Sequence, residues 1–298
     1  MLIDLHAHSS VSDGTDSPAE LVVAAAAAGL DVVALTDHDT TAGWDRALAA
    51  APPGLRVLPG AEVSTTAVGA AGTPITVHLL AYLFDPASPA LVAEQTRLRA
   101  ERRSRLRQMV ARMVADGLPV DERSVFDGLD ADAPAGRPHL ARALVRARVV
   151  GSVDEAFEHH LRDGGPYHVR RADTPLLDAV RMIADAGGVT VLAHAYAGRR
   201  GAIIGDDTVA ALAAAGLAGL EVDHPEHDAD ARARLRSLAT DLSLVVTGGS
   251  DYHGANKRTA LGAETTAPSA FDELLTRVPQ RPRWPPKRNP GVPTGTSG

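Results

Sequence analysis

The chain has 298 residues, of which 45% are hydrophobic and 12 are histidine, and its formal net charge is −7. It contains no cysteine, which excludes disulfides, iron–sulfur clusters, zinc–thiolate sites and cysteine nucleophiles. The acidic balance and an aromatic content of only 3% argue against a broad nucleic-acid-binding surface, which needs basic and stacking side chains.

The first residues, Met1–Asp4, lack the positive region and the apolar region of a signal peptide. Nowhere does the sequence approach the roughly 18 uninterrupted apolar residues of a membrane-spanning helix. We therefore expect a soluble, cytoplasmic protein without a membrane partner, and the sequence leaves its oligomeric state open.

Short runs rich in β-branched residues and leucine recur along the chain and are typical of strands buried on both faces. Helical patterns separate most of them. The pattern at 18–29 begins after the N-cap candidate Ser17, has Glu20 three residues later and ends at a glycine, and 174–187 repeats it with Pro175 at its start. Alternating strands and helices predict an α/β fold with a parallel sheet, open or closed into a barrel. The predicted strands are 2–6, 31–36, 56–62, 75–83, 189–194, 219–222 and 244–250.

The interval 86–168 breaks this alternation, because it contains helix-like segments at 97–112, 139–149 and 153–162 but no convincing strand. We predict a helical insertion domain, or cap, over one end of the sheet; helical decoration remote from any site is the alternative. The remaining strands fall into 1–85 and 169–276, which form a discontinuous barrel domain. The proline-rich tail 277–298 is expected to be disordered, with a weak nucleic-acid tether as the alternative.

Histidines and carboxylates gather at the ends of the predicted strands. Residues two apart in an extended chain face the same side, so His6 and His8 can bind one metal ion. The carboxyl ends of parallel strands meet at one rim, which predicts a multinuclear site of imidazole and carboxylate groups. Further candidates are Asp13, His38, Glu62, His78, His194, Asp251 and His253. Four histidines that do not belong to such a strand-end motif are expected at the surface: His159, His160, His224 and His227.

These motifs resemble those of the PHP family, named for polymerase and histidinol phosphatase, from Met1 to about Gly262. The resemblance implies a distorted, TIM-like (βα)7 barrel with three divalent ions at its C-terminal rim. Manganese is the favoured ion, with zinc or iron as alternatives. The motifs are Asp-Leu-His-Ala-His at 4–8, Thr-Asp-His-Asp at 36–39, Gly-Ala-Glu at 60–62, a strand histidine at 78, Ala-His at 193–194 and Gly-Ser-Asp-Tyr-His at 249–253.

The resemblance also implies how the ligands divide among the ions and what attacks the substrate. A metal-bound hydroxide, and no protein side chain, would be the nucleophile. Ala195 departs from the family pattern, in which proline is frequent, and this affects the fit of the substrate more than metal binding. The first ion would be held by His6, His8, Glu62 and Asp251, the second by Glu62, His78 and His194, and the third by Asp13, His38 and His253.

The helical insertion between the fourth and fifth barrel strands resembles the nucleotide phosphoesterase branch of the family. This implies a phosphoesterase that removes the 3′-phosphate of nucleoside 3′,5′-bisphosphates, trims short RNA from its 5′ end, or does both. The alternatives are histidinol-phosphate phosphatase, a phosphatase of mononucleotides or cyclic nucleotides, and a non-catalytic metal-binding module.

A second phosphate anchor is predicted from the residues Gly-Arg-Pro-His at 136–139. A helix N-terminus, the guanidinium of Arg137 and the imidazole of His139 could meet one phosphate there. A surface arginine beside a helix cap is the alternative. Further arginines considered for this role are Arg99, Arg102, Arg103, Arg170, Arg171 and Arg199.

Overall fold

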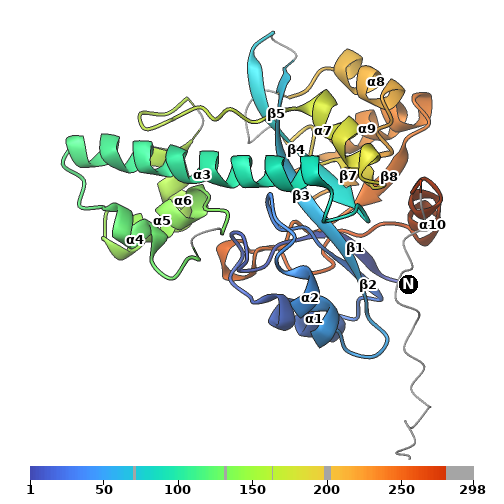
Figure 1. Ribbon diagram of the computed structural model, residues 1–298, viewed down its shortest axis with the longest axis horizontal. Helices are drawn as coiled ribbons and strands as arrows, with labels where there is room; N and C mark the ends of the chain where they lie inside the picture. The colour runs from blue at the N-terminus through green and yellow to red at the C-terminus, as the bar shows by residue number, and fades with distance from the viewer. Residues whose placement is uncertain (70–71, 131–132, 163, 198–202, 280–298) are drawn as a thin grey trace, which may run out of the picture.

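A nearly closed barrel forms the centre of the molecule, whose computed structural model describes residues 1–298 except 70–71, 131–132, 163, 198–202 and 280–298 (Figure 1). An isolated parallel bridge between Ala7 and Tyr252 links the first barrel strand to the segment after the last one. The predicted distorted barrel is therefore confirmed. The main path of its eight-stranded sheet runs β1(Ile3–Ala7), β2(Val32–Leu35), β3(Arg56–Val68), β4(Pro74–Tyr82), β6(Val189–Leu192), β7(Gly219–Asp223) and β8(Val245–Gly248), and β5(Thr174–Pro175) pairs with β3 off this path.

The strand β4 runs against the predicted direction. Strands β1, β2 and β3 pair in parallel, as do β6, β7 and β8, but β4 is antiparallel to both β3 and β6. The pairing of β3 with β4 extends from Gly60–Tyr82 to Val68–Pro74, and only residues 69–73 separate the strands. A connection this short permits a hairpin and cannot hold a helical crossover. The prediction of a wholly parallel sheet is wrong at β4.

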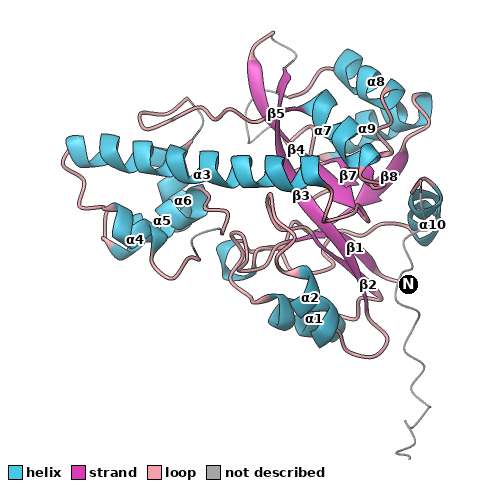
Figure 2. Cartoon of the chain, viewed as in Figure 1, coloured by secondary structure: helices cyan, strands magenta, loops and turns pink. Residues whose placement is uncertain are grey.

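Helices surround the barrel (Figure 2). The first begins at the predicted capping box: the Glu20 N–H donates to Ser17 Oγ and the Ser17 N–H donates to Glu20 Oε2. The helix predicted at 174–187 begins two residues later, because Thr174 and Pro175 pair with β3. The helices around the barrel are α1(Pro18–Ala27), α2(Trp44–Ala50), α7(Leu176–Asp185), α8(Asp206–Ala214), α9(Ala229–Asp241) and α10(Pro268–Thr276), with the 3₁₀ turn η3(Gly254–Asn256) after β8.

The interval 86–168 is helical, as predicted. Its longest helix, α3, starts beside the barrel and ends among the shorter helices α4 to α6, at the side of the molecule away from α8 and α9 (Figure 1). Buried apolar side chains, Leu106, Met109, Leu140 and Leu144 among them, form a cluster within this interval. The division into domains at 85/86 and 168/169 stays a prediction. The elements are α3(Pro89–Ala115), α4(Glu122–Phe126), α5(Arg137–Arg146), α6(Val153–Ala156) and the π-helix η1(Phe157–Leu161).

Two further sequence expectations concern membranes and the tail. Among the described residues, no helix combines the length and apolar character that a membrane crossing requires. Residues 280–298 of the predicted tail lie outside the described residues, whereas Arg277 ends α10 and donates to the carbonyls of Ala218 and Ser243.

Candidate metal centre

The structure brings all nine predicted ligands together at one end of the barrel. Eight of the nine side chains are buried and His78 is half-buried. His78 lies inside β4, paired with Ser64, and therefore reaches the site from the middle of an antiparallel strand and not from a carboxyl end. The ligand candidates are His6, His8, Asp13, His38, Glu62, His78, His194, Asp251 and His253.

Strand β1 and the residue that follows it supply two of these side chains, His6 and His8, through simple alternation. Ile3 and Leu5 face an apolar cluster, whereas His6 and His8 face the site. The segment after β8 passes directly against β1: a Cβ on Gly249 would lie 2.4 Å from the Cβ of His6. Glycine at this position therefore allows the chain after β8 to deliver Asp251 beside the β1 histidines.

The carboxylate of Glu62 lies at the centre and divides the surrounding imidazoles into two groups. Its Oε1 lies 2.7 Å from His78 Nδ1 and 2.9 Å from His194 Nε2. Its Oε2 lies 3.0 Å from His8 Nε2 and 3.3 Å from His6 Nε2. One carboxylate thus offers one oxygen to each of two neighbouring positions, which is the geometry of a bridging ligand.

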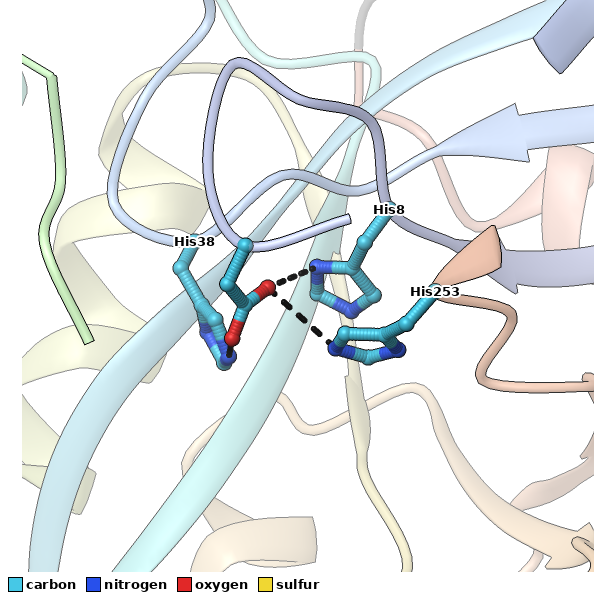
Figure 3. Close-up of side chains that lie close together, drawn as sticks. His8, His38 and His253 are labelled. Atoms are coloured by element: carbon cyan, nitrogen blue, oxygen red, sulfur yellow. Dashed lines mark ion pairs between the residues drawn. The ribbon is translucent and has the colours of Figure 1, made fainter. Parts of the chain in front are cut away.

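A third group surrounds Asp13, which follows β1 (Figure 3). Asp13 Oδ1 lies 3.2 Å from His253 Nε2 and 3.7 Å from His8 Nδ1, and Oδ2 lies 3.7 Å from His38 Nε2. The rings of His8 and His253 stack with centroids 4.2 Å apart. Burial raises the pKa of Asp13, but the imidazoles outweigh burial and hold this pKa well below its ordinary value.

The two oxygens of Asp251 face different surroundings. Oδ1 lies 3.4 Å from His6 Nε2 and 3.5 Å from His8 Nε2, on the side of the ligand candidates. Oδ2 pairs with the ammonium of Lys257 and lies 3.3 Å from His224 Nε2. Lys257 and His224 therefore fix the carboxylate so that Oδ1 points into the cluster.

Opposite charges set the ionisation of the buried groups. Burial raises the pKa of Glu62, but neighbouring imidazoles, those of His78 and His38 first, hold this pKa well below its ordinary value. Burial lowers the pKa of His6, but the carboxylates of Glu221 and Glu62 outweigh it and hold the pKa of His6 well above its ordinary value. The carboxylates are therefore ionised at neutral pH and attract positive charge.

The donor set fits divalent ions. Within the part of the chain that the structure describes, the buried Nδ1 atoms of His38 and His78 form no hydrogen bond of suitable geometry, although they lie 3.3 and 2.7 Å from oxygens of Glu62. His6 Nε2 and His8 Nε2 lie only 3.1 Å apart, a spacing that suits two nitrogens around one cation. Imidazole and carboxylate groups suit manganese, zinc and iron. The candidate ligand groups are His6, His8, Glu62 and Asp251; His8, Asp13, His38 and His253; His38, Glu62 and His78; and His6, Glu221 and His224.

Sequence reasoning missed the residues that support this cluster. His224 and His227 are predicted at the surface, but both are buried, because the segment after β7 packs against the cluster and places His224 Nε2 3.3 Å from Asp251 Oδ2. His227 Nδ1 lies 2.9 Å from the Val222 carbonyl oxygen, and its Nε2 accepts from the Tyr196 N–H. Glu221 was overlooked. Its signal was present, because it is a carboxylate inside the otherwise apolar run 219–222.

Two members of the predicted phosphate anchor, the start of α5 and His139, have a different position from the third, the Arg137 side chain. The start of α5 lies at the cluster, since a Cβ on Gly136 would be 3.7 Å from Asp13 Oδ2 and 3.5 Å from Arg102 Nη1. His139 is buried and its Nδ1 accepts from the Gly136 N–H. Arg137 Nη1 donates to the Leu161 carbonyl, and its guanidinium lies over the Phe157 ring.

A barrel with buried imidazole and carboxylate groups at one end defines a class of proteins whose side chains can hold metal ions. Residues 4–119 match the family model of the PHP domain. The 3′,5′-nucleoside bisphosphate phosphatase of Chromobacterium violaceum is 36% identical over 256 residues, which cover 84% of this chain and 87% of that protein. The chain therefore belongs to the PHP family, and the resemblance seen in the sequence is confirmed.

Two further proteins resemble this chain over most of its length. The 5′-3′ exoribonuclease of Haemophilus influenzae is 32% identical over 253 residues, which cover 84% of this chain and 89% of that protein. A crystal structure from Bifidobacterium adolescentis, of a protein assigned as a metal-dependent phosphoesterase, superposes with a TM-score of 0.84 and 34% identity. The superposition covers 92% of this chain and 96% of that one.

Proposed function

We propose that this protein is a metal-dependent phosphoesterase that hydrolyses a phosphate ester of a small nucleotide. The observation that carries the proposal is the division of Glu62 between two groups of imidazoles, with Oε1 toward His78 and His194 and Oε2 toward His6 and His8. With the group around Asp13, this supports three divalent ions per chain, manganese being the favoured one.

The bound ions would supply Lewis acidity, an activated water and a clamp on the phosphoryl oxygens. The chain's own residues hold this arrangement. Glu62 would set the spacing between the first two positions, and His8 belongs to the ligand groups of both the first position and the third. We propose that no side chain acts as the nucleophile.

The substrate class is supported by the relatives and by the start of α5. The names of the relatives point to nucleoside 3′,5′-bisphosphates and to RNA 5′ ends. The N-terminus of the ten-residue helix α5 lies beside Asp13 and Arg102, where the positive end of the helix dipole would favour a substrate phosphate. We propose His139 as a phosphate contact there. Arg137 would reach the same phosphate only after leaving the Leu161 carbonyl.

An assay of purified, Mn²⁺-loaded protein on adenosine 3′,5′-bisphosphate tests the proposal. Released phosphate and the nucleotide product are followed separately, with 5′-phosphorylated dinucleotides, cyclic nucleotides and histidinol phosphate as parallel substrates. We expect turnover of the bisphosphate or of the dinucleotides. Preference for histidinol phosphate would overturn the nucleotide assignment, and absence of turnover on every substrate would favour a non-catalytic metal-binding module.

The ligand roles are tested by His8→Ala and Asp251→Ala. Both changes remove a buried ligand candidate, so we expect loss of metal content and activity while the circular dichroism spectrum is kept. His159→Ala, at an exposed histidine of the insertion, serves as the matched control and should keep both. Full activity in the first two variants would refute the ligand assignment.

The cytoplasmic location stays a prediction from the sequence.

A further inference from the structure

The carboxylate of Glu221 lies next to the proposed metal centre and contacts two of its candidate ligands, His6 and His194. Glu221 is 1% exposed and comes from β7. Its Oε1 lies 2.9 Å from His6 Nδ1, and its Oε2 accepts from the His194 N–H at 2.8 Å. A single buried side chain therefore links a histidine of β1 to a histidine that follows β6.

The first contact fixes the tautomer and the direction of His6. An ionised carboxylate only accepts hydrogen bonds, so His6 Nδ1 must carry the proton. The opposite nitrogen, Nε2, then faces the cluster, 3.1 Å from His8 Nε2 and 3.3 Å from Glu62 Oε2. When an ion displaces the proton from Nε2, the Nε2 lone pair would be directed at the first metal position.

The second contact fixes the backbone of His194. This residue has φ of 29°, in the left-handed region that non-glycine residues rarely adopt. The Glu221 carboxylate binds the N–H of the residue that carries this strain. Held in this way, His194 places its Nε2 2.9 Å from Glu62 Oε1, at the second metal position.

We propose that Glu221 is a positioning residue of the metal centre, which orients His6 for the first ion through the imidazole and His194 for the second ion through the backbone. This inference rests on the proposed function, because it requires that the cluster binds metal. Glu221 itself contacts no substrate in this role. Groups of this kind typically change metal affinity by about 10–100-fold when they are replaced.

The variant Glu221→Gln tests the positioning role without changing the size of the side chain. Glutamine has the same shape, but it offers one acceptor and one donor where the site needs two acceptors. The backbone N–H of His194 has no alternative tautomer, so the amide oxygen will face it and the NH₂ will face His6 Nδ1. His6 must then accept at Nδ1 and carry its proton on Nε2, which prevents Nε2 from binding an ion.

The test measures Mn²⁺ binding to the full chain by calorimetric titration. We expect Glu221→Gln to bind Mn²⁺ about 10–100-fold more weakly than the wild type, with an unchanged circular dichroism spectrum. Long-range ¹H–¹⁵N spectra of Zn²⁺-loaded protein should show the His6 proton on Nδ1 in the wild type and on Nε2 in the variant. Val222→Ala, which removes buried methyl groups from the same strand, should lower the melting temperature and keep the Mn²⁺ affinity.

The outcomes separate this inference from the proposed function. Wild-type Mn²⁺ binding with equal affinity in Glu221→Gln would overturn the positioning role alone. Loss of one ion, with the others bound at wild-type affinity and the His6 proton unmoved, would also overturn it, because Glu221 would then be a ligand with His6 and His224. A wild-type chain that binds no Mn²⁺ would overturn the proposed function itself.

Discussion

At Gly249 the main chain has no room for a side chain. A Cβ would lie 2.4 Å from His6 Cβ and 2.8 Å from the His6 backbone nitrogen, and neither atom can move without shifting β1. We expect Gly249→Ala to lower the free energy of unfolding by about 1–3 kcal/mol, as overpacking does. It should also weaken Mn²⁺ binding, since His6 and Asp251 move apart.

Urea unfolding and Mn²⁺ titration check this prediction. Gly151→Ala is the matched control, because among the described residues a Cβ there would approach only the flexible end of Glu155, at 3.2 Å. Equal stability and equal Mn²⁺ affinity in the two variants would show that the contact with His6 is unimportant.

The buried imidazole of His139 predicts a dependence of stability on pH. Burial, with Arg142 nearby, lowers the pKa of His139 to about 4 from an ordinary value of 6.5. The unfolded chain therefore binds more protons between these values, so stability is lost as the pH falls from about 6.5 to about 4. The shift corresponds to about 3 kcal/mol.

This prediction is measured as a difference between wild type and His139→Gln. Urea unfolding in EDTA at several pH values between 7.5 and 4 should show the wild type losing about 3 kcal/mol more than the variant. Other buried histidines titrate in both proteins and cancel in the comparison. Parallel curves would contradict the pKa assigned to His139.

The candidate ligands could be predicted from the sequence because each sits in a short local pattern. His6 and His8 share a strand face through alternation, and Asp251 and His253 follow a strand end. Glu221 and His224 could not be assigned in this way, because their contacts with His6 and Asp251 join segments far apart in the chain. The orientation of Arg137 toward Leu161 depends on the packing of the insertion, which no local pattern encodes.

Helix α3 is attached to the barrel by a buried ion pair. The Arg102 guanidinium donates to the carboxylate of Asp39 and to Ser64 Oγ, and both charged side chains are buried. Arg102→Met would remove the cation that is hydrogen-bonded to buried Asp39 and leave Arg171 and the hydrogen bonds from Ser64 to stabilise this charge, so we expect a loss of about 3 kcal/mol in the free energy of unfolding. The double variant Asp39→Asn/Arg102→Met should recover part of this loss.

Urea unfolding of both proteins measures the effect, and the same helix offers a control. Arg107 pairs with Glu122 at 3.3 Å, and both side chains are about half exposed. Arg107→Met should therefore cost less than about 1 kcal/mol. A similar loss from Arg102→Met and Arg107→Met would mean that burial of the first pair has no energetic consequence.

The antiparallel β4 shows where element prediction fails. The apolar runs at 56–62 and 75–83 identify strands correctly, but strands buried on both faces read alike whatever their direction. Residues 63–68, of which only Ser64, Thr65 and Thr66 are polar, continue β3 because they pair with 74–79, and that pairing is specified by the partner strand. Direction and length thus depend on tertiary pairing, whereas the existence of each strand does not.

For the whole molecule, the net charge of −7 is opposite in sign to the electrostatic potential that we expect at the metal-loaded site. Three divalent ions would add about +6 against the carboxylates of Asp13, Glu62 and Asp251, so the loaded rim would attract phosphate. Binding to the folded state alone also stabilises it, by about 2.7 kcal/mol per site when the ion is present at 100 times its dissociation constant.

We therefore expect Mn²⁺ to raise the melting temperature above that in EDTA by at least about 5 °C, given a shift of about 2–4 °C per kcal/mol. Differential scanning calorimetry measures this. Asp251→Ala should show a smaller rise, because one proposed ligand is missing. An equal rise in the variant would indicate that Mn²⁺ stabilises the protein from another position.

The closure of the barrel between β1 and the segment after β8 has a consequence for biosynthesis. The Ser250 N–H donates to Asp4 Oδ1 across 246 residues, and His6 and His8 meet Asp251 and His253 at the same seam. At roughly 5–20 residues per second, the ribosome needs about 10–50 s to make the chain between them. Throughout that interval His6 and His8 lack Asp251 and His253, so the centre can be assembled only after residue 253 has been made.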